Sequence, residues 1–387
     1  MRLAGVIAIV WLHAYLWGTG WRDAHGGDVV RVWAMGLMRW GMPFLGCLSG
    51  YLFFRGVQPT RAWFLGKYRR RFHSLVVPFL LWSTLGIAYA AAAELATGDY
   101  SGGTSALEAL RALPFGFPVW GQLWFLQGLI TCVAVSPVVY LGVRRACVPL
   151  LLATTAWWIF GQMYFFDAPW LAAGVLLPFS VGAAAAVRGW RAPRPSAPVV
   201  AGLTAAWVGA AALFATFGLG LGYATLAGQL VVAALGVAAV WCLADVAAVW
   251  LRRHPRLTAA VLWAAPFAFF VYVSQNPLLE LTHRYVTLRL PAASGSRWLE
   301  YVLQCVVDVV FALVLGGGSC GGACRGRSRS SPAAAGCCGR GGGRRPRRRP
   351  PRAPAERPPP ARAASVTEAR PPAAGSAVDA CPRDGVC

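Results

Sequence analysis

The sequence predicts an all-α membrane protein, a bundle of about ten transmembrane helices. The chain has 387 residues, of which 57% are hydrophobic and only 13% are charged, whereas about a quarter of the residues in a soluble globular domain are charged. Several uninterrupted apolar runs are long enough to cross a bilayer, which takes roughly 20 residues as a helix. Basic residues gather in the short segments between these runs, as in the loops of polytopic proteins.

Ten apolar runs account for the membrane-spanning part of the chain. The second is interrupted by Arg39, and the fifth and sixth are almost continuous, separated at Asp167. In chain order the predicted spans are 3–21, 32–54, 75–93, 120–143, 148–166, 168–187, 197–219, 224–251, 257–281 and 298–315.

The first span has a basic residue before an apolar core, as a signal peptide does. No cleavage site with small residues follows the core, so we expect an uncleaved span. Only Met1 and Arg2 precede the apolar run. This short lead favours a true start codon upstream of Met1.

The loops between the spans predict the orientation of the chain. The even-numbered loops hold 14 Lys and Arg residues, and the odd-numbered loops hold 6. Because basic loops stay in the cytoplasm, we expect both termini of a ten-span chain there. The ninth loop, with Arg284, Arg289 and Arg297, is the exception; it is either a solvated loop or a site for an anion on the outer side.

Residues 317–387 differ in composition from the rest of the chain. They hold fourteen arginines and four acidic residues, so about +10 of the net charge of +22 lies there. They contain almost no large aliphatic residues, and we expect a disordered tail after a membrane domain at 1–316. The tail is either a frameshift product or a basic segment that binds anionic lipid. Because the remaining charge lies mostly beside apolar spans, we expect membrane lipids and not nucleic acid as partners.

The eleven cysteines do not indicate a disulfide framework. Six lie in the tail, and five are scattered singly in apolar spans, where cysteine packs as a small hydrophobic residue. Outside the tail there is no P-loop, dinucleotide-binding fingerprint, HExxH motif or zinc-type cysteine pair. We therefore expect no metal.

His13 is the first candidate for chemistry because it is an ionisable residue inside an apolar span. Such residues are costly in a membrane and often functional, and histidine can accept a proton from a hydroxyl near neutral pH. The alternative is a neutral histidine that hydrogen-bonds between helices. Arg2 precedes His13 by a distance of about 16 Å on a helix. An anion at Arg2 on the cytoplasmic face could therefore send a long arm inward to His13.

The spacing Arg2-x10-His13 resembles the signature of the acyltransferase family 3 integral-membrane enzymes. Four other segments resemble motifs of that family in the same order: RWGMPFLGCLSGYLF (39–53), KYRRRFHSLVVPF (67–79), LWFLQGL (123–129) and FVYVSQNPLL (270–279). The resemblance covers residues 2–316. It implies a bacterial inner-membrane enzyme that transfers acyl groups, usually acetyl from acetyl-CoA, to hydroxyls of a glycan or a lipid-linked saccharide.

The resemblance also implies roles for the matching residues. His13 is expected to act on the acceptor hydroxyl as a general base, or to carry the acyl group itself. Arg2 and the cluster of Arg69, Arg70 and Arg71 are expected to bind the phosphates of coenzyme A, which arginine forks suit; the cluster alternatively only sets the topology.

Gln275 is a departure from the family pattern. Family members often carry histidine there, and glutamine can hydrogen-bond but cannot exchange a proton near pH 7. We expect Gln275 to orient a substrate or a water.

Four further residues are expected to bind substrate or to support the site. Arg39 contacts an acyl oxygen or reaches the interface, and Ser49 and Gly50 are more typical of close helix packing than of nucleophilic attack. Trp124 stacks on a sugar or lies at the membrane interface. Asp308 lies in the middle of the last span, where it must pair with a basic or polar group.

Two alternative functions fit the same sequence. A non-catalytic transporter of glycans or lipid-linked intermediates is also a polytopic helical protein, although many transporters contain internal repeats and the two halves of this chain show no convincing repeat. A degenerate, inactive relative of the enzymes is the other alternative, suggested by Gln275 and by the unusual tail.

Overall fold

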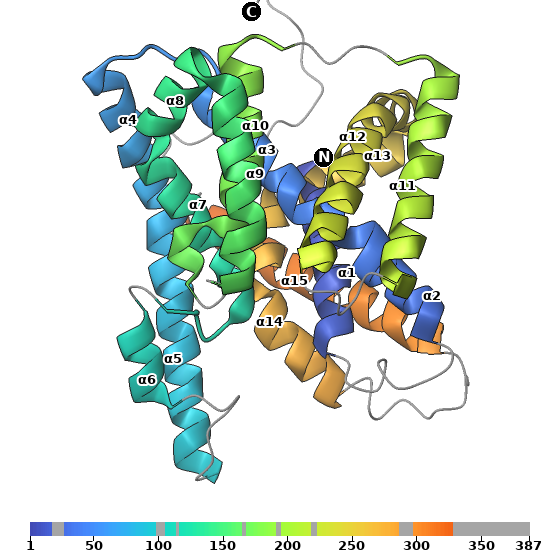
Figure 1. Ribbon diagram of the computed structural model, residues 1–387. Helices are drawn as coiled ribbons and strands as arrows, with labels where there is room; N and C mark the ends of the chain where they lie inside the picture. Colours follow the sequence, from blue (N-terminus) through green and yellow to red (C-terminus); the bar gives the residue numbers. More distant parts are fainter. Residues whose placement is uncertain are drawn as a thin grey trace, which may run out of the picture. The chain divides into compact units, whose positions relative to one another are not determined.

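The predicted spans become helices in the computed structural model of the protein. It describes residues 1–17, 27–97, 105–113, 116–164, 168–190, 195–217, 223–285 and 297–327, all within one compact unit, Met1–Ser331. These residues contain helices and no strand, which confirms the all-α prediction (Figure 1). The elements are α1 (Arg2–Trp17), α2 (Gly27–Arg31), η2 (Val32–Gly36), η3 (Leu37–Trp40), α3 (Gly41–Phe54), α4 (Arg61–Arg71), η4 (Phe72–Val76), α5 (Val77–Thr97), α6 (Ala106–Ala112), η6 (Gly121–Leu123), α7 (Trp124–Ala134), α8 (Ser136–Arg145), α9 (Cys147–Tyr164), η7 (Pro169–Leu171), α10 (Ala173–Val187), α11 (Ala197–Phe217), α12 (Tyr223–Arg252), α13 (Pro255–Ala264), η8 (Ala265–Phe267), α14 (Ala268–Tyr285) and α15 (Arg297–Arg327).

Each predicted span overlaps a helix or a series of helical segments. In the described part of the chain, five segments are long and apolar enough to cross a membrane, or six if the pair α7–α8, bent by 63°, is one span. The apolar parts of α1 and α15 are shorter. The number of ten spans therefore stays a prediction. The break at Asp167, Arg289, the side chains of Arg284 and Arg297, and the tail after residue 327 lie outside the described residues.

The second predicted span changes its helical geometry twice. A π-helix, η2, is followed by a 3-10 helix, η3, before α3 begins. Helix α11 packs closely against η2, because a Cβ added to Gly36 would lie 2.7 Å from the Ala211 carbonyl oxygen. Such irregular turns inside a helix often mark functional segments, and this one lies beside α1.

Glycines allow α3 and α10 to pack in direct contact. A Cβ added to Gly50 on α3 would overlap the Phe179 carbonyl oxygen, and one added to Gly182 on α10 would overlap the Cys47 carbonyl oxygen. The small residues of the second-span motif therefore form a helix interface, as predicted for Gly50.

Helix α1 lies inside the bundle, with α14 and α15 beside it (Figure 1). Ile9 and Val10 are buried in the main apolar cluster, and Ala14 and Tyr15 in a second cluster shared with α14 and α15. Helix α1 is therefore held by three separate parts of the chain: the α3 region, α14 and α15.

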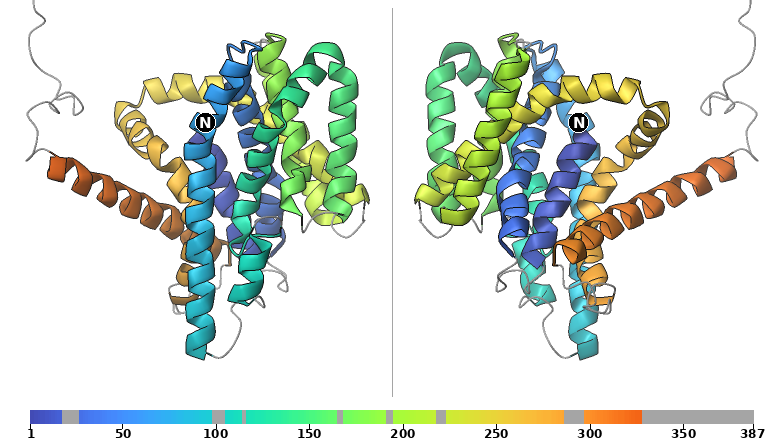
Figure 2. Two further views of the ribbon diagram at one scale, coloured as in Figure 1. Left: turned by 90° about the vertical axis from the view of Figure 1, so that its left-hand side faces the viewer. Right: turned by 90° about the vertical axis from the view of Figure 1, so that its right-hand side faces the viewer.

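Helix α15 continues beyond the predicted end of the last span at Leu315 and reaches Arg327. Figure 2 shows it (orange to brown) leaving the bundle at a steep angle. Gly316 still faces the rings of Phe267 and Phe270, and Gly317 faces Trp263. These contacts pair α15 with α13, η8 and α14.

Candidate active site

His13 and Gln275 are hydrogen-bonded to each other. The distance from His13 Nδ1 to Gln275 Oε1 is 2.9 Å, and the other amide atom, Gln275 Nε2, donates to the Tyr272 carbonyl at 2.7 Å. Gln275 is fully buried, with 2% of its surface exposed, whereas His13 is only partly buried. The structure thus brings together two residues that are 262 positions apart in the sequence.

The residues before Gln275 are hydrogen-bonded to η6, which directly precedes α7. Gln122 Nε2 donates to the Val273 carbonyl at 3.0 Å, and the Tyr272 hydroxyl donates to the Gln122 carbonyl. Gln122 is itself buried. Gln122, directly before the LWFLQGL motif, therefore fixes the turn of α14 from which Gln275 projects.

Helix α15 packs against α1 close to His13 in the sequence. The Tyr301 hydroxyl donates to the Trp11 carbonyl, and the Trp11 and Tyr301 rings meet edge to face with centroids 5.6 Å apart. Because Trp11 is two residues before His13, this contact holds α15 against the part of α1 that carries the imidazole.

The register between α14 and α15 places Asp308 near the level of Gln275. The two helices pack together in an antiparallel sense, because Leu279 clusters with Tyr301 and Cys305 while Gly316 faces Phe270 and Phe267. Asp308 lies between these contacts along α15 and is buried, with 2% exposed. Its position is consistent with a supporting role in the same region.

Two buried amides in this region were not predicted from the sequence. Gln304 is 1% exposed, and Asn276, which follows Gln275, is 6% exposed. Three of their side-chain atoms have no hydrogen-bond partner among the described protein atoms: Gln304 Nε2, Gln304 Oε1 and Asn276 Oδ1. Gln304 lies one helical turn before Asp308, so the two polar residues share one face of an apolar span. This spacing would have identified Gln304 in the sequence.

The basic end of α1 lies beside α4. Arg71 is partly buried, and its burial, followed by the neighbouring Arg2 cation, lowers the pKa of Arg71 from its ordinary value. Arg71 remains cationic near neutral pH, because the ordinary pKa of arginine is above 12. An anion bound between Arg71 and Arg2 would relieve their repulsion. Arg69 and Arg70 are exposed, so the structure distinguishes Arg71 from its two neighbours.

The remaining predicted residues make contacts elsewhere. Arg39 donates from Nε to the Met35 carbonyl at 2.5 Å, and its guanidinium lies 5.2 Å from the Phe214 ring centroid on α11. Ser49 is half-buried on α3. Trp124 faces Gly174 at the beginning of α10. The described contacts of these three side chains therefore do not include His13.

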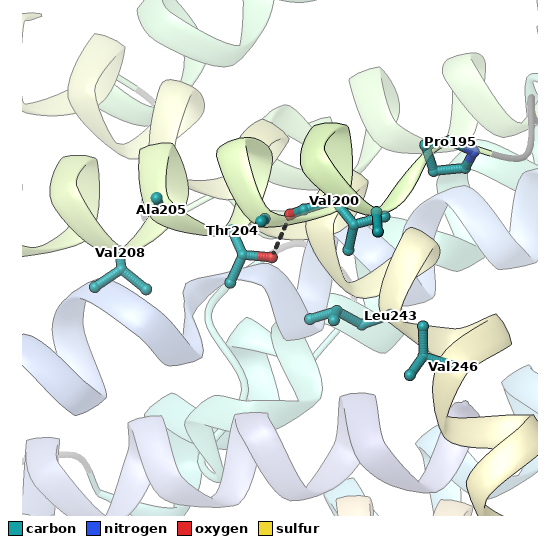
Figure 3. Close-up of a pocket in the computed structure, with 9 residues that line it drawn as sticks. Pro195, Val200, Thr204, Ala205, Val208, Leu243 and Val246 are labelled. Carbon is teal, nitrogen blue, oxygen red and sulfur yellow. Dashed lines mark hydrogen bonds between the residues drawn. The ribbon is translucent and has the colours of Figure 1, made fainter.

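An apolar hollow of about 770 Å³ lies between α11 and α12 (Figure 3). The Thr204 hydroxyl, which is part of its lining, donates to the Val200 carbonyl of its own helix at 2.8 Å. None of the predicted site residues lines this hollow. We therefore place the candidate active site at His13 and not in the hollow.

The arrangement suits proton transfer or nucleophilic attack by an imidazole. The Nδ1 atom of His13 is held in a hydrogen bond, and the residue as a whole is partly buried. Within the described residues, no group of three or more His, Cys, Asp or Glu side chains could hold a metal ion.

Comparisons with known proteins agree with the resemblance seen in the sequence. The chain is 28% identical over 225 residues to the succinoglycan biosynthesis protein ExoH of Rhizobium meliloti (strain 1021), an alignment that covers 53% of this chain and 58% of ExoH. The chain thus spans little more than half the length of that relative. No solved structure matches it. The family model described as an acyltransferase domain matches residues 1–317, and the chain, an integral membrane protein, therefore belongs to that acyltransferase family.

Proposed function

We propose that the protein transfers an acyl group, acetyl or a related group, from cytoplasmic acyl-CoA to a hydroxyl of a cell-surface polysaccharide or its lipid-linked precursor. Residues 1–316 form the catalytic part, in a bacterial inner membrane with both termini in the cytoplasm. The observation that carries the proposal is the placement of His13 and Arg2 on one helix, with the imidazole hydrogen-bonded inside the bundle and the guanidinium beside Arg71.

The distance between these two ends fits an extended substrate. The two residues are about 16 Å apart along the helix axis. Arg2 and Arg71 bind the phosphates of coenzyme A, and the flexible arm of that substrate runs inward to bring the thioester to His13. Arg69 and Arg70, which are exposed on the same helix as Arg71, add to the positive potential that attracts the anionic donor.

The chemical step follows from an unprotonated imidazole nitrogen. His13 accepts the proton of the acceptor hydroxyl while the oxygen attacks the thioester carbonyl. The new carbon–oxygen ester bond forms, the carbon–sulfur bond breaks, and the proton passes from the imidazolium to the thiolate of coenzyme A. In the alternative sequence, a nitrogen of His13 attacks the thioester first, so that a carbon–nitrogen bond forms, the carbon–sulfur bond breaks and the thiolate leaves. The acceptor hydroxyl then attacks the acyl carbon, the carbon–nitrogen bond breaks, and the hydroxyl proton passes to the thiolate. Both sequences use the same nitrogen and give the same products.

Two observations support a saccharide acceptor. The relative ExoH is named for the biosynthesis of succinoglycan. In addition, buried amides at Asn276 and Gln304 lie on the helices around His13 and suit the binding of hydroxyl groups. Asp308 supports this part of the site, and we assign Arg39, Ser49 and Trp124 to helix packing or to the edges of the acceptor site.

The proposal is tested with membrane vesicles and radiolabelled acetyl-CoA. Inverted vesicles, which expose the cytoplasmic face, are expected to incorporate label into polysaccharide as an alkali-labile ester, and right-side-out vesicles are not. His13→Ala is expected to lower the rate by about 10²–10⁴-fold, the usual contribution of a general base, with normal amounts of protein in the membrane.

His254 provides the matched control, because it is exposed at the junction of α12 and α13. His254→Ala is expected to retain the wild-type rate. A fully active His13→Ala protein would contradict the catalytic assignment, and equal labelling by right-side-out vesicles would contradict a cytoplasmic donor.

A further inference from the structure

We propose that Gln275 is a positioning residue that holds His13 in the tautomer with the proton on Nδ1 and leaves Nε2 as the reactive nitrogen. This inference rests on the proposed function, because it assigns the atom of His13 that meets the acceptor hydroxyl or the thioester. It gives Gln275 a role of its own, although glutamine cannot itself exchange a proton near neutral pH.

The hydrogen bonds of Gln275 determine which atom faces His13. A backbone carbonyl can only accept a hydrogen bond, so the Gln275 atom that lies 2.7 Å from the Tyr272 carbonyl must be the NH₂ group. The atom 2.9 Å from His13 Nδ1 is then the amide oxygen. The opposite assignment of the amide would place two acceptors against each other at Tyr272.

The amide oxygen in turn determines the tautomer of His13. Because this oxygen can only accept, Nδ1 must carry the proton and donate. In a neutral imidazole the second nitrogen is then an acceptor with a free lone pair. Nε2 is therefore the atom that can take a proton from a hydroxyl or attack a carbonyl carbon, and the ring is fixed in direction by the same bond.

The surroundings make Gln275 a rigid support. The side chain is fully buried, and the preceding turn of α14 is held by the Gln122 amide at Val273 and by the Tyr272 hydroxyl at the Gln122 carbonyl. An orienting partner of this kind raises the fraction of histidine in the useful tautomer and removes rotational freedom from the ring. Gln275 acts through His13 and needs no contact with the substrate.

The direct test measures the tautomer and does not depend on activity. The full-length protein is labelled with ¹⁵N-histidine and placed in lipid bilayers for solid-state NMR, and the His13 signals are assigned by comparison with His13→Ala. The wild-type protein is expected to show a protonated Nδ1 and an unprotonated Nε2. Gln275→Met, which keeps the length of the side chain but removes the acceptor, is expected to lose this preference. A proton on Nε2 in the wild type, or an unchanged spectrum in Gln275→Met, would overturn the inference.

Kinetics provide a second readout that a purely structural role would not give. Gln275→Met is expected to lower kcat by about 10- to 100-fold, the usual effect of removing an orienting partner of a functional histidine, with KM for acyl-CoA changed less than about twofold. Gln275→Glu retains an oxygen that can accept from Nδ1 and is expected to recover much of the lost rate. Equal rates in Gln275→Met and the wild type, or no recovery in a well-folded Gln275→Glu, would overturn the inference.

The two proposals fail in different ways. Full activity in His13→Ala removes the proposed catalytic role of His13, whatever the spectrum shows. An inactive His13→Ala together with a wild-type rate in Gln275→Met leaves the catalytic role intact and removes only the positioning role of Gln275.

Discussion

Gly182 on α10 lies directly against the Cys47 carbonyl on α3, with no room for a Cβ between them. Gly50, on α3, meets the Phe179 carbonyl of α10 in the same way. Close approach of helix backbones at small residues is a common means of helix association in membranes, where apolar burial does not drive helices together. This contact joins the second-span motif to α10, and the buried side of α3 also packs against α1.

Alanine at either glycine is expected to destabilise the protein. Gly50→Ala and Gly182→Ala must push the two helices apart, at a cost of about 1–3 kcal/mol or more for an overpacked interface. The thermal midpoint in detergent and the amount of monodisperse protein measure this loss.

Gly202→Ala is the matched control, because nothing lies within 4 Å of a Cβ at Gly202 on α11. It is expected to be neutral or stabilising by up to about 1 kcal/mol through helix propensity. A midpoint for Gly182→Ala equal to that of Gly202→Ala would show that the helix contact is not tight.

Removal of the charge at Arg71 is expected to weaken binding of acyl-CoA. Arg71→Gln and Arg2→Gln should each raise KM for acyl-CoA about tenfold or more, the loss expected for a hydrogen bond to a charged group, and should change kcat little. Initial rates over a range of acyl-CoA concentrations measure both constants.

The arginines nearby give a graded comparison. Arg69→Gln is expected to have a smaller effect than Arg71→Gln, because Arg69 is exposed whereas Arg71 is partly buried and feels the charge of Arg2. Arg253→Gln, at an exposed position after α12, should have none. A larger effect at Arg69 than at Arg71 would contradict the donor site.

Single cysteines test the orientation of the bundle. In a background without the native cysteines, Gly66→Cys on α4 is expected to be protected from a membrane-impermeant maleimide in intact cells, because its loop is basic and cytoplasmic. Leu107→Cys, at an exposed position of α6, is expected to be labelled. The reverse labelling pattern would invert the topology and move Arg2 away from cytoplasmic acyl-CoA.

Truncation after Gly318 is expected to leave acyl transfer intact. The shortened chain keeps the contacts of Gly316 with Phe267 and of Gly317 with Trp263, so the inner part of α15 still packs on its neighbours. The lost arginines could add only attraction to an anionic membrane surface, about 1 kcal/mol each near the surface. Rates in vesicles adjusted to equal amounts of protein provide the measurement, and a truncated protein that inserts normally but is inactive would assign the tail a function.

The helical fold could be predicted from the sequence because the length of a single apolar run is enough to indicate a membrane span. The irregular parts could not. The second span contains a π-helix and a 3-10 helix before α3, a geometry in which Gly36 lies against Ala211 of a helix far along the chain. The continuation of α15 to Arg327 was missed because the sequence after Leu315 loses its apolar character.

The site was predicted as separate residues and not as an arrangement. His13 and Asp308 are unusual within their own apolar runs, so each could be identified alone, and Gln275 was identified because it departs from the family pattern. The bond between His13 and Gln275 joins α1 to α14, and only the packing of the helices brings these residues together. Gln304 was missed because an amide in an apolar run is less conspicuous than a charge. The difference between Arg71 and Arg69 depends on which side of α4 faces Arg2.

Because the helix is continuous between Arg2 and His13, α1 fixes both the distance between the two residues along the helix axis and the angle between their directions around it. Inserting one residue between them would lengthen the interval by only about 1.5 Å but would turn the imidazole about 100° around the helix axis. That rotation would carry Nδ1 away from Gln275 even where the added length is harmless. A substitution in residues 3–12 keeps the orientation of His13 and has only to fit the packing around α1. An insertion or deletion there rotates His13 around the helix axis, and we expect it to abolish activity.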